Sequence, residues 1–179
     1  MESEYIFTSL RLGFREWRST DLTQMAAINA NPSVMEFFPS TQSIDQTADF
    51  INRNQQLFSE QRFCYFAVEL LSSREFIGFI GLSQVKFEAP FTPCVDIGWR
   101  LSSSHWGNGY ATEGALRCLE YAQTVLKLKE VFSMAPVTNI RSIEVMIKIG
   151  MKKNSNFIHP LLNDHVTLKN CSLYSIHLV

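Results

Sequence analysis

The residues best placed for chemistry form a glycine-rich segment, Trp106-Gly107-Asn108-Gly109-Tyr110-Ala111-Thr112. It follows a strand-like run, residues 95–101, and precedes a helical pattern that begins near Tyr110. Glycines let a backbone approach an anion because no Cβ stands in the way. The first turn of a helix adds free N–H groups and the positive end of the helix dipole. The segment therefore predicts a cradle for the phosphates of a small ligand, formed by N–H groups from Gly107 to Thr112, with the Thr112 hydroxyl as a further donor.

Two common glycine motifs do not fit this segment. A P-loop ends in Gly-Lys-Ser/Thr, and no lysine stands here. A dinucleotide fingerprint needs a third Gly or Ala where this chain has Thr112, and an acidic residue that closes the next strand. Glu130 lies about 20 residues further on but precedes its strand. The pattern therefore points away from an NTPase loop and from a dinucleotide site.

Two further motifs flank the glycine segment in a recognisable order, Val95-Asp96-Ile97-Gly98-Trp99-Arg100-Leu101 before it and Asn139-Ile140-Arg141-Ser142, leading to Gly150-Met151, after it. Residues 95–151 resemble the GNAT superfamily of N-acetyltransferases, in particular the branch that includes bacterial ribosomal-protein N-terminal acetyltransferases. The glycine segment matches the family's Arg/Gln-x-x-Gly-x-Gly/Ala turn, and the downstream motif matches its Asn-x-x-Ser helix. The chain departs from the family at Trp106, where Arg or Gln is usual, and at Met151, where an aromatic residue is usual.

The resemblance implies acetyl-CoA as co-substrate, with its pyrophosphate on the glycine segment and its pantetheine arm between two splayed strands, residues 95–101 and 129–135. It places Asn139 on the pantetheine arm, in addition to the helix cap that the position itself predicts. It places Ser142 near the cofactor sulfur, although an exposed first-turn serine would explain that residue equally well. The residues assigned to the cofactor are Trp99, Arg100, Leu101, Trp106, Gly107, Asn108, Gly109, Tyr110, Ala111, Thr112, Asn139 and Ser142.

Acetyl transfer to an amine requires the amine in its neutral form, and the resemblance implies direct attack on the thioester. An α-amino group, with a pKa of about 8, is neutralised more easily than a lysine, with a pKa of about 10.4. Asp96 is the candidate general base because it occupies the acidic position of the family's strand and shares a face with Gly98. The alternative is a solvated carboxylate paired with Arg100. The following strand, residues 132–135, has no carboxylate. The catalytic candidates are Asp96 and, near the sulfur, Ser142.

Composition limits the other classes of function. At 179 residues with 46% hydrophobic and 18% charged residues, the chain is expected to form a single globular domain spanning residues 1–179. A net charge of −1 lacks the basic excess of nucleic-acid-binding proteins and leaves a short acidic substrate possible. No membrane span or basic leader is evident, so a cytoplasmic location is expected. The four cysteines and the histidines show no metal-ligand spacing, so reduced thiols and no metal are expected.

Hydrophobic periodicity, together with the resemblance, predicts an α/β fold of GNAT type, with a mixed and mostly antiparallel sheet of about six or seven strands flanked by helices. Strands are predicted at residues 10–17, 63–71, 76–87, 95–101, 129–135 and 168–179, and helices at 22–30, 44–59, 110–126 and 140–149. Caps are predicted at 19–21 and, as a capping box, at Ser43 and Gln46. Ile143, Met146 and Ile147 should face inward. Trp99 is expected in the core, Trp106 beside the cofactor, and Phe37, Phe38 and Phe58 in the core or in an acceptor pocket.

The sequence thus predicts an acetyl-CoA-dependent N-acetyltransferase that acts on a primary amine, with a protein or peptide N-terminus as the first choice. A small-molecule amine, such as an aminoglycoside, polyamine or amino acid, is the alternative acceptor; convergence of Glu36, Asp45 and Asp49 in the acceptor pocket would favour it. A module that binds acyl-CoA without turnover is the alternative outside the enzyme class. Members of the family often form homodimers, and no interface is evident in this sequence.

Overall fold

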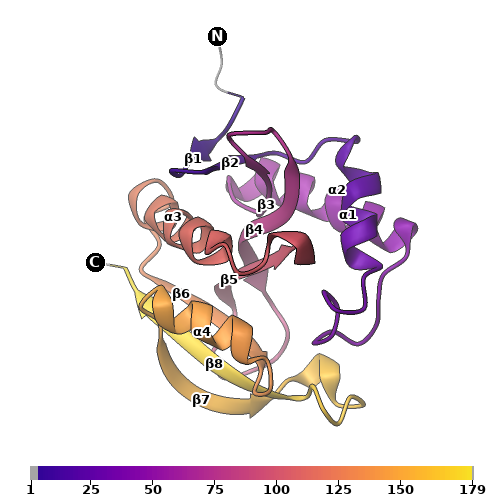
Figure 1. Cartoon of the computed structure of the whole chain (residues 1–179). Helices are drawn as coiled ribbons and strands as arrows, with labels where there is room; N and C mark the ends of the chain where they lie inside the picture. Colours follow the sequence, from indigo (N-terminus) through magenta and orange to yellow (C-terminus); the bar gives the residue numbers. More distant parts are fainter. Residues whose placement is uncertain (1–3, 179) are drawn as a thin grey trace.

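One mixed sheet of eight strands contains the β structure of residues 4–178, the part of the chain that the computed structural model describes (Figure 1). The strands pair in the order β1-β2-β3-β4-β5-β6-β8-β7, and every neighbouring pair is antiparallel except β5 and β6. The predicted mixed sheet is confirmed, with more strands than expected. The strands are β1 (Phe7–Thr8), β2 (Leu12–Arg15), β3 (Tyr65–Leu70), β4 (Phe76–Val85), β5 (Cys94–Leu101), β6 (Glu130–Pro136), β7 (Lys152–Ile158) and β8 (Asn170–His177).

Four α-helices and two short 3-10 helices complete the described part of the chain. They are α1 (Asp21–Asn29), α2 (Ile44–Gln61), η1 (Ser103–His105), α3 (Tyr110–Thr124), α4 (Ile140–Lys148) and η2 (Pro160–Leu162). Figure 1 shows α3 and α4 side by side in front of the sheet, with α1 and α2 at its other side. None of the helices within residues 4–178 has the length and apolar composition needed to cross a bilayer.

Strand alternation separates two hydrophobic clusters. Phe66 and Ile80 lie in a large cluster that also contains buried side chains of α3 and α4. Ala67 and Phe79, one position away along the same strands, lie in a second cluster with side chains of α1 and α2. Because successive side chains of a strand point to opposite faces, the two clusters occupy the two faces of the sheet. A strand in the middle of this sheet therefore presents one set of side chains to α3 and α4 and the other set to α1 and α2.

The predicted helix caps are confirmed in one case and wrong in the other. Ser43 forms the predicted capping box at the start of α2. At α1, the N-cap residue Thr20 makes no side-chain capping bond. Asp21 instead accepts two hydrogen bonds of 2.8 Å from the buried Arg15 guanidinium, which also pairs with Glu69. A buried guanidinium needs anionic partners. The Asp21 carboxylate therefore binds Arg15 and does not cap the helix.

Other differences from the predicted elements have local causes. Strand β7 was not predicted because six of its seven residues are exposed, so its sequence lacks the alternating apolar pattern of a half-buried strand. Strand β1 has only two residues, which is too short for a periodic signal. Ile147 is 57% exposed, so its predicted inward position is wrong. The final strand covers residues 170–177, and Val179, which the prediction included, lies outside the described residues.

Candidate active site

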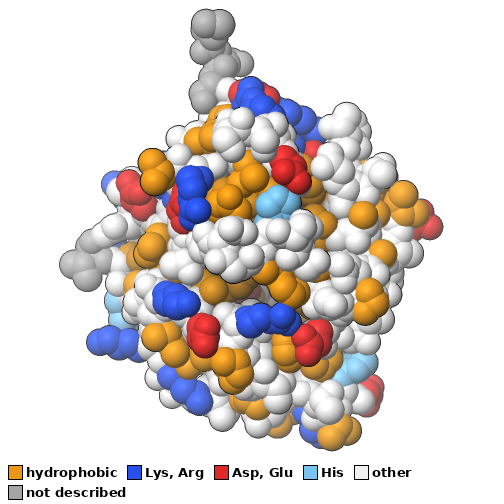
Figure 2. Space-filling model, viewed as in Figure 1, with side chains coloured by type: hydrophobic (Ala, Val, Ile, Leu, Met, Phe, Trp, Pro, Cys, Tyr) orange, Lys and Arg blue, Asp and Glu red, His pale blue; other side chains and the backbone are white. Residues whose placement is uncertain are grey.

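A pocket of about 610 Å³ lies where β5 and β6 separate. Its walls come from these two strands, the first turn of α3, helix α4, and Ser33, Val34, Phe37 and Phe38 of the loop between α1 and α2. Figure 2 shows hydrophobic side chains within the hollow between α3 and α4 and charged side chains of both signs along α4. The pocket thus brings together the three sequence motifs, which lie between residues 95 and 151 of the chain.

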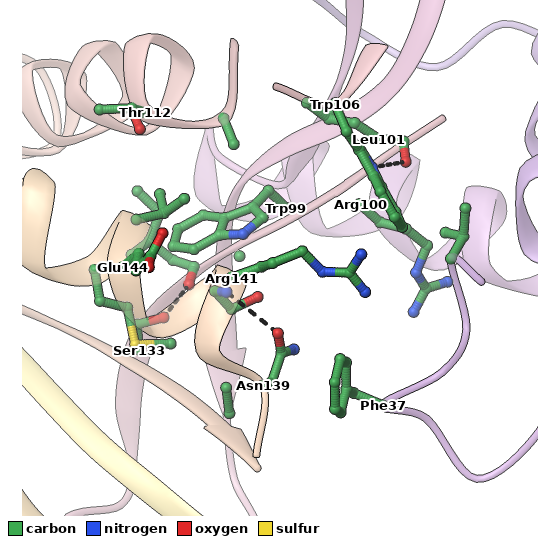
Figure 3. A pocket seen from close by; sticks show the side chains of 18 of the residues that line it. Phe37, Trp99, Arg100, Leu101, Trp106, Thr112, Ser133, Asn139, Arg141 and Glu144 are labelled. Carbon is green, nitrogen blue, oxygen red and sulfur yellow. Dashed lines mark hydrogen bonds between the residues drawn. The ribbon is translucent and has the colours of Figure 1, made fainter. Parts of the chain in front are cut away.

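The separation of β5 from β6 forms the floor of the pocket. Asp96 and Phe132 are the one residue pair in register between these parallel strands. Just beyond this pair, the Ser133 hydroxyl donates to the Ile97 carbonyl at 2.9 Å. At the end of β5, the Trp106 indole N–H donates to the Leu101 carbonyl at 2.9 Å (Figure 3). Side chains thus bind two β5 carbonyls, and the gap between the strands stays open to a ligand.

The glycine segment has the geometry of an anion cradle. Gly107 and Gly109 both have φ of +78°, a left-handed conformation that favours glycine. Within residues 4–178, the N–H groups of Gly107, Asn108 and Gly109 donate to no acceptor. A Cβ on Gly107 would meet nothing within 4 Å, so the surface of the loop there is open. The first turn of α3 adds the N–H groups of Tyr110, Ala111 and Thr112, which have no partner inside the helix. The loop therefore has the conformation and the free donors predicted for the cradle, and its binding of phosphate stays a prediction.

Trp106, at the family's Arg/Gln position, forms a wall of the pocket. Its indole is fixed by the bond to Leu101, and the Arg141 guanidinium of α4 lies 4.4 Å above its ring. Arg141 also pairs with Glu36 of the α1–α2 loop at 2.7 Å. This contact connects α4 to the opposite side of the pocket mouth.

Arg11 supplies a cation beside the cradle that the sequence reading did not identify. Its Nη2 donates to the Asn108 carbonyl at 3.0 Å, and its guanidinium lies 4.5 Å above the Tyr110 ring. Its Nε pairs with Glu113 at 2.6 Å. Arg11 is almost one hundred residues from the glycine segment, a separation of 97 from Asn108. No local sequence pattern could have connected the two.

Asn139 and Ser142 open α4 toward the pocket. The Asn139 side chain accepts a hydrogen bond of 3.2 Å from the Ser142 N–H, so its predicted capping role is confirmed (Figure 3). Both residues line the pocket. Trp99, expected in the core, packs against the large cluster and also lines the pocket. Its contact with the cofactor stays a prediction.

Asp96 lies in the pocket and is bound to Tyr65. The Tyr65 hydroxyl is 3.0 Å from one Asp96 carboxylate oxygen and 3.1 Å from the other. Burial raises the pKa of Asp96 to about 7, against the opposing effect of the Tyr65 hydrogen bond. The alternative in which Asp96 pairs with Arg100 is wrong, because the Arg100 guanidinium binds Asn29 at 2.7 Å. Sequence reading missed Tyr65, which is on β3, two strands away from Asp96 in the sheet.

The Arg100 side chain lies on the α1–α2 face, away from the glycine cradle. Arg100 pairs in register with Phe79, a member of the cluster on that face, and its guanidinium lies 5.4 Å above the Phe79 ring. The Phe38 ring lies 4.2 Å from the same guanidinium. The predicted contact between Arg100 and the cofactor can therefore involve only the Arg100 backbone, and it stays a prediction.

The remaining candidates divide between the pocket and the core. Phe37 and Phe38 line the pocket, whereas Phe58 is buried in the large cluster. Glu36, Asp45 and Asp49 do not converge there: among the described lining residues, the carboxylates are Asp96 and Glu144. His105 lines the pocket, with its Nε2 3.3 Å from a Glu75 carboxylate oxygen. No group of three or more His, Cys, Asp or Glu residues suited to a metal is found within residues 4–178.

Comparison with known proteins agrees with this geometry. The sequence model of the Acetyltransferase (GNAT) domain matches residues 11–152, most of the chain. The uncharacterized N-acetyltransferase YoaA of Bacillus subtilis is 24% identical over 168 residues, which is 93% of each chain. The crystal structure of RimL, a ribosomal L7/L12 α-N-protein acetyltransferase in complex with coenzyme A, superimposes with a TM-score of 0.79 at 13% identity over 98% of both chains. Spermidine N-acetyltransferase of Vibrio cholerae, in complex with CoA and spermine, gives 0.74 at 18% identity over 93% of this chain and 95% of that one.

Proposed function

Because this chain belongs to the GNAT acetyltransferase family, we propose that it transfers the acetyl group of acetyl-CoA to the α-amino group of a protein or peptide N-terminus. The observation that carries the proposal is the position of Asp96: a half-buried carboxylate in the same pocket as the phosphate cradle. The cradle fits a phosphorylated ligand, since its N–H groups are free and its glycines are open toward the pocket. Residues suited to bind the cofactor and a residue suited to deprotonate the acceptor thus lie in one cavity.

Acetyl-CoA, when bound, supplies an acetyl group on a thioester. In this proposal the N–H groups of residues 107–112 hold its pyrophosphate, and the gap between β5 and β6 receives the pantetheine arm. Asp96 accepts a proton from the acceptor ammonium, directly or through water, while Tyr65 holds the carboxylate in place. The neutral amine then forms its bond to the acetyl carbon as the carbon–sulfur bond breaks, and the acylated nitrogen gives its second proton to the departing thiolate, directly or through water. The thiolate leaves readily because an alkyl thiol has a pKa of about 8.5.

Removing a proton from an α-ammonium group costs less free energy than removing one from a lysine ammonium, whatever base accepts it. Transfer of a proton from an α-ammonium, with a pKa of about 8, to a base with a pKa of about 7 costs about 1.4 kcal/mol. Transfer from a lysine ammonium, with a pKa of about 10.4, costs between 4 and 5 kcal/mol by the same relation, as a rough figure. The difference of roughly 3 kcal/mol between the two transfers favours an α-amino acceptor.

A polyamine acceptor is the second candidate, because spermidine N-acetyltransferase shares the fold. The charges of this pocket argue against a polycation. Its described lining contains two carboxylates, Asp96 and Glu144, and three cationic side chains, Arg100, Arg141 and Lys148. Binding without turnover is the less favoured reading, since the family is enzymatic and Asp96 is in position to act as a base.

The proposal is tested in two stages. Calorimetric titration should show saturable binding of acetyl-CoA and none of NADH. A thiol-release assay should then show turnover with peptides that carry a free N-terminus, and none with the same peptides blocked at the N-terminus but containing lysine. Turnover of spermidine with no turnover of any free peptide N-terminus would replace the proposed acceptor. Absence of acetyl-CoA binding would overturn the assignment of the cradle.

A further inference from the structure

The Arg100 guanidinium is a buried cation that has no anionic partner within the described residues. Arg100 is 8% exposed and lines the pocket. Its Nη1 donates to the Asn29 side-chain oxygen at 2.7 Å, while its Nε is buried and has no hydrogen-bond partner. Burial lowers the pKa of Arg100 to about 10, so the group remains charged at neutral pH. The other buried arginine, Arg15, has two carboxylate partners.

Neutral groups hold this guanidinium in place. Asn29 is fully buried, and its amide donates to the Thr47 hydroxyl at 3.0 Å. The rings of Phe38 and Phe79 lie 4.2 and 5.4 Å from the guanidinium carbon. These contacts orient the group and shield it from water, but they leave its charge without a counter-ion. A desolvated guanidinium with free donors is suited to bind a carboxylate.

The same pocket contains both the Arg100 guanidinium and the candidate base, Asp96. Asp96 and Arg100 lie on the same face of β5, with their Cα atoms about 13 Å apart at the usual rise of a strand. Tyr65 and Phe79 lie between them, with stacked rings 4.9 Å apart, and Tyr65 reaches Asp96. Figure 3 shows Arg100 and Arg141 extending into the pocket from different elements. Arg141 already has a carboxylate partner, Glu36, at 2.7 Å.

We infer that Arg100 binds a carboxylate of the acceptor, and that the acceptor is an amine that carries an acid group several bonds from its nitrogen. The amine lies at Asp96, the spacer crosses the Tyr65 and Phe79 rings, and the acid group reaches Arg100. A peptide with an acidic side chain at its second or third position has this chemistry, and so does a small amine with a distant carboxylate. The inference deepens the proposed function and rests on it for the role of Asp96.

A binding experiment tests the Arg100 site without turnover. The probes are 4-phenylbutyrate and 4-phenylbutyramide, which differ only in the charge of the group offered to Arg100, titrated calorimetrically into the protein saturated with CoA. The carboxylate should bind about 10- to 100-fold more tightly than the amide to the wild type. Arg100→Gln should remove this preference, and Arg141→Gln should keep it. Equal affinity of the two probes for the wild type, or a preference that Arg141→Gln alone abolishes, would overturn the inference.

Two further arms identify the source of the carboxylate. Peptide pairs with Asp or Asn at the second or third position should differ in kcat/KM by a similar factor in the wild type and not in Arg100→Gln; a preference confined to small amino acids would assign the acid group to a small acceptor. Arg100→Gln should leave acetyl-CoA affinity unchanged, and a tenfold loss would reassign Arg100 to a cofactor phosphate and refute the inference. Arg100→Lys, which keeps the charge, should retain part of the preference if Arg100→Gln does not fold. Failure of transfer to every amine, with the probe preference intact, would refute the proposed function alone.

Discussion

Replacing Asp96 with asparagine should slow acetyl transfer and at the same time stabilise the fold. Burial raises the pKa of this carboxyl from 3.8 to about 7, so the native state binds the proton more tightly than the unfolded chain does. The stability of the wild type is therefore full at acid pH and falls as the pH rises from about 4 to about 7. Asparagine cannot ionise but can still accept the Tyr65 hydrogen bond. The stability of the variant should therefore not fall over this pH range.

The magnitude follows from the pKa difference. The shift from 3.8 to about 7 corresponds to at most about 4 kcal/mol at pH 8, at 1.36 kcal/mol for each unit of pKa. Partial exposure of Asp96 reduces this figure, so roughly 2 kcal/mol is expected. For a chain of this size, that stabilisation raises Tm by roughly 4–8 °C. Loss of the general base should lower kcat by about 10²- to 10⁴-fold.

Two assays check these outcomes. Thermal unfolding of wild type and variant from pH 4 to pH 8 should show a gap in Tm that widens as the pH rises. Thiol release at saturating acetyl-CoA should show the loss of kcat, while calorimetry should give an unchanged Kd for acetyl-CoA. Asp164→Asn, which removes an exposed carboxylate outside the pocket, is the matched control and should change neither quantity. Unaltered turnover would refute the base, and a Tm gap independent of pH would refute the raised pKa.

The cradle, the tyrosine and the neighbouring arginine can each be tested in the same way. Gly109→Val should abolish acetyl-CoA binding, because valine is strained at φ +78°, whereas Gly150→Val, at φ +87° outside the pocket, should bind normally; equal losses would contradict the cradle. Tyr65→Phe should shift the rise of kcat/KM to higher pH, because loss of the hydroxyl donor raises the pKa of Asp96 further, and an unshifted profile would show that the pair does not act. Arg11→Gln should weaken acetyl-CoA binding roughly tenfold by removing a cation beside the cradle, and an unchanged Kd at low salt would exclude that role.

The sequence allowed prediction of those parts of the site that are local in the chain. The glycine segment, the start of α3 and the Asn139 cap each depend on residues within a few positions of one another, and each is present as predicted. The alternation of β5 correctly placed Asp96 and Arg100 on one face.

What could not be predicted depends on contacts between distant segments. Tyr65 reaches Asp96 across a separation of 31 residues, and Asn29 reaches Arg100 across 71. The alternative pairing of Asp96 with Arg100 fails because each has a partner from another element. Strand β7 was missed for a different reason, since hydrogen bonding to β8 forms it without a buried face.

The two faces of β5 carry side chains with different roles. Ile97 and Leu101 point toward α3 and α4, the side of the cradle, and Asp96 and Arg100 point toward α1 and α2. Gly98, between the two charged residues, has no side chain, and a Cβ there would meet the Tyr65 ring at 3.1 Å. The missing side chain thus makes room for the ring that holds the base. Strand β5 thereby fixes the distance between Asp96 and Arg100. Because an acceptor must place its amine at one and its carboxylate at the other, its charge distribution should decide the rate of acetyl transfer.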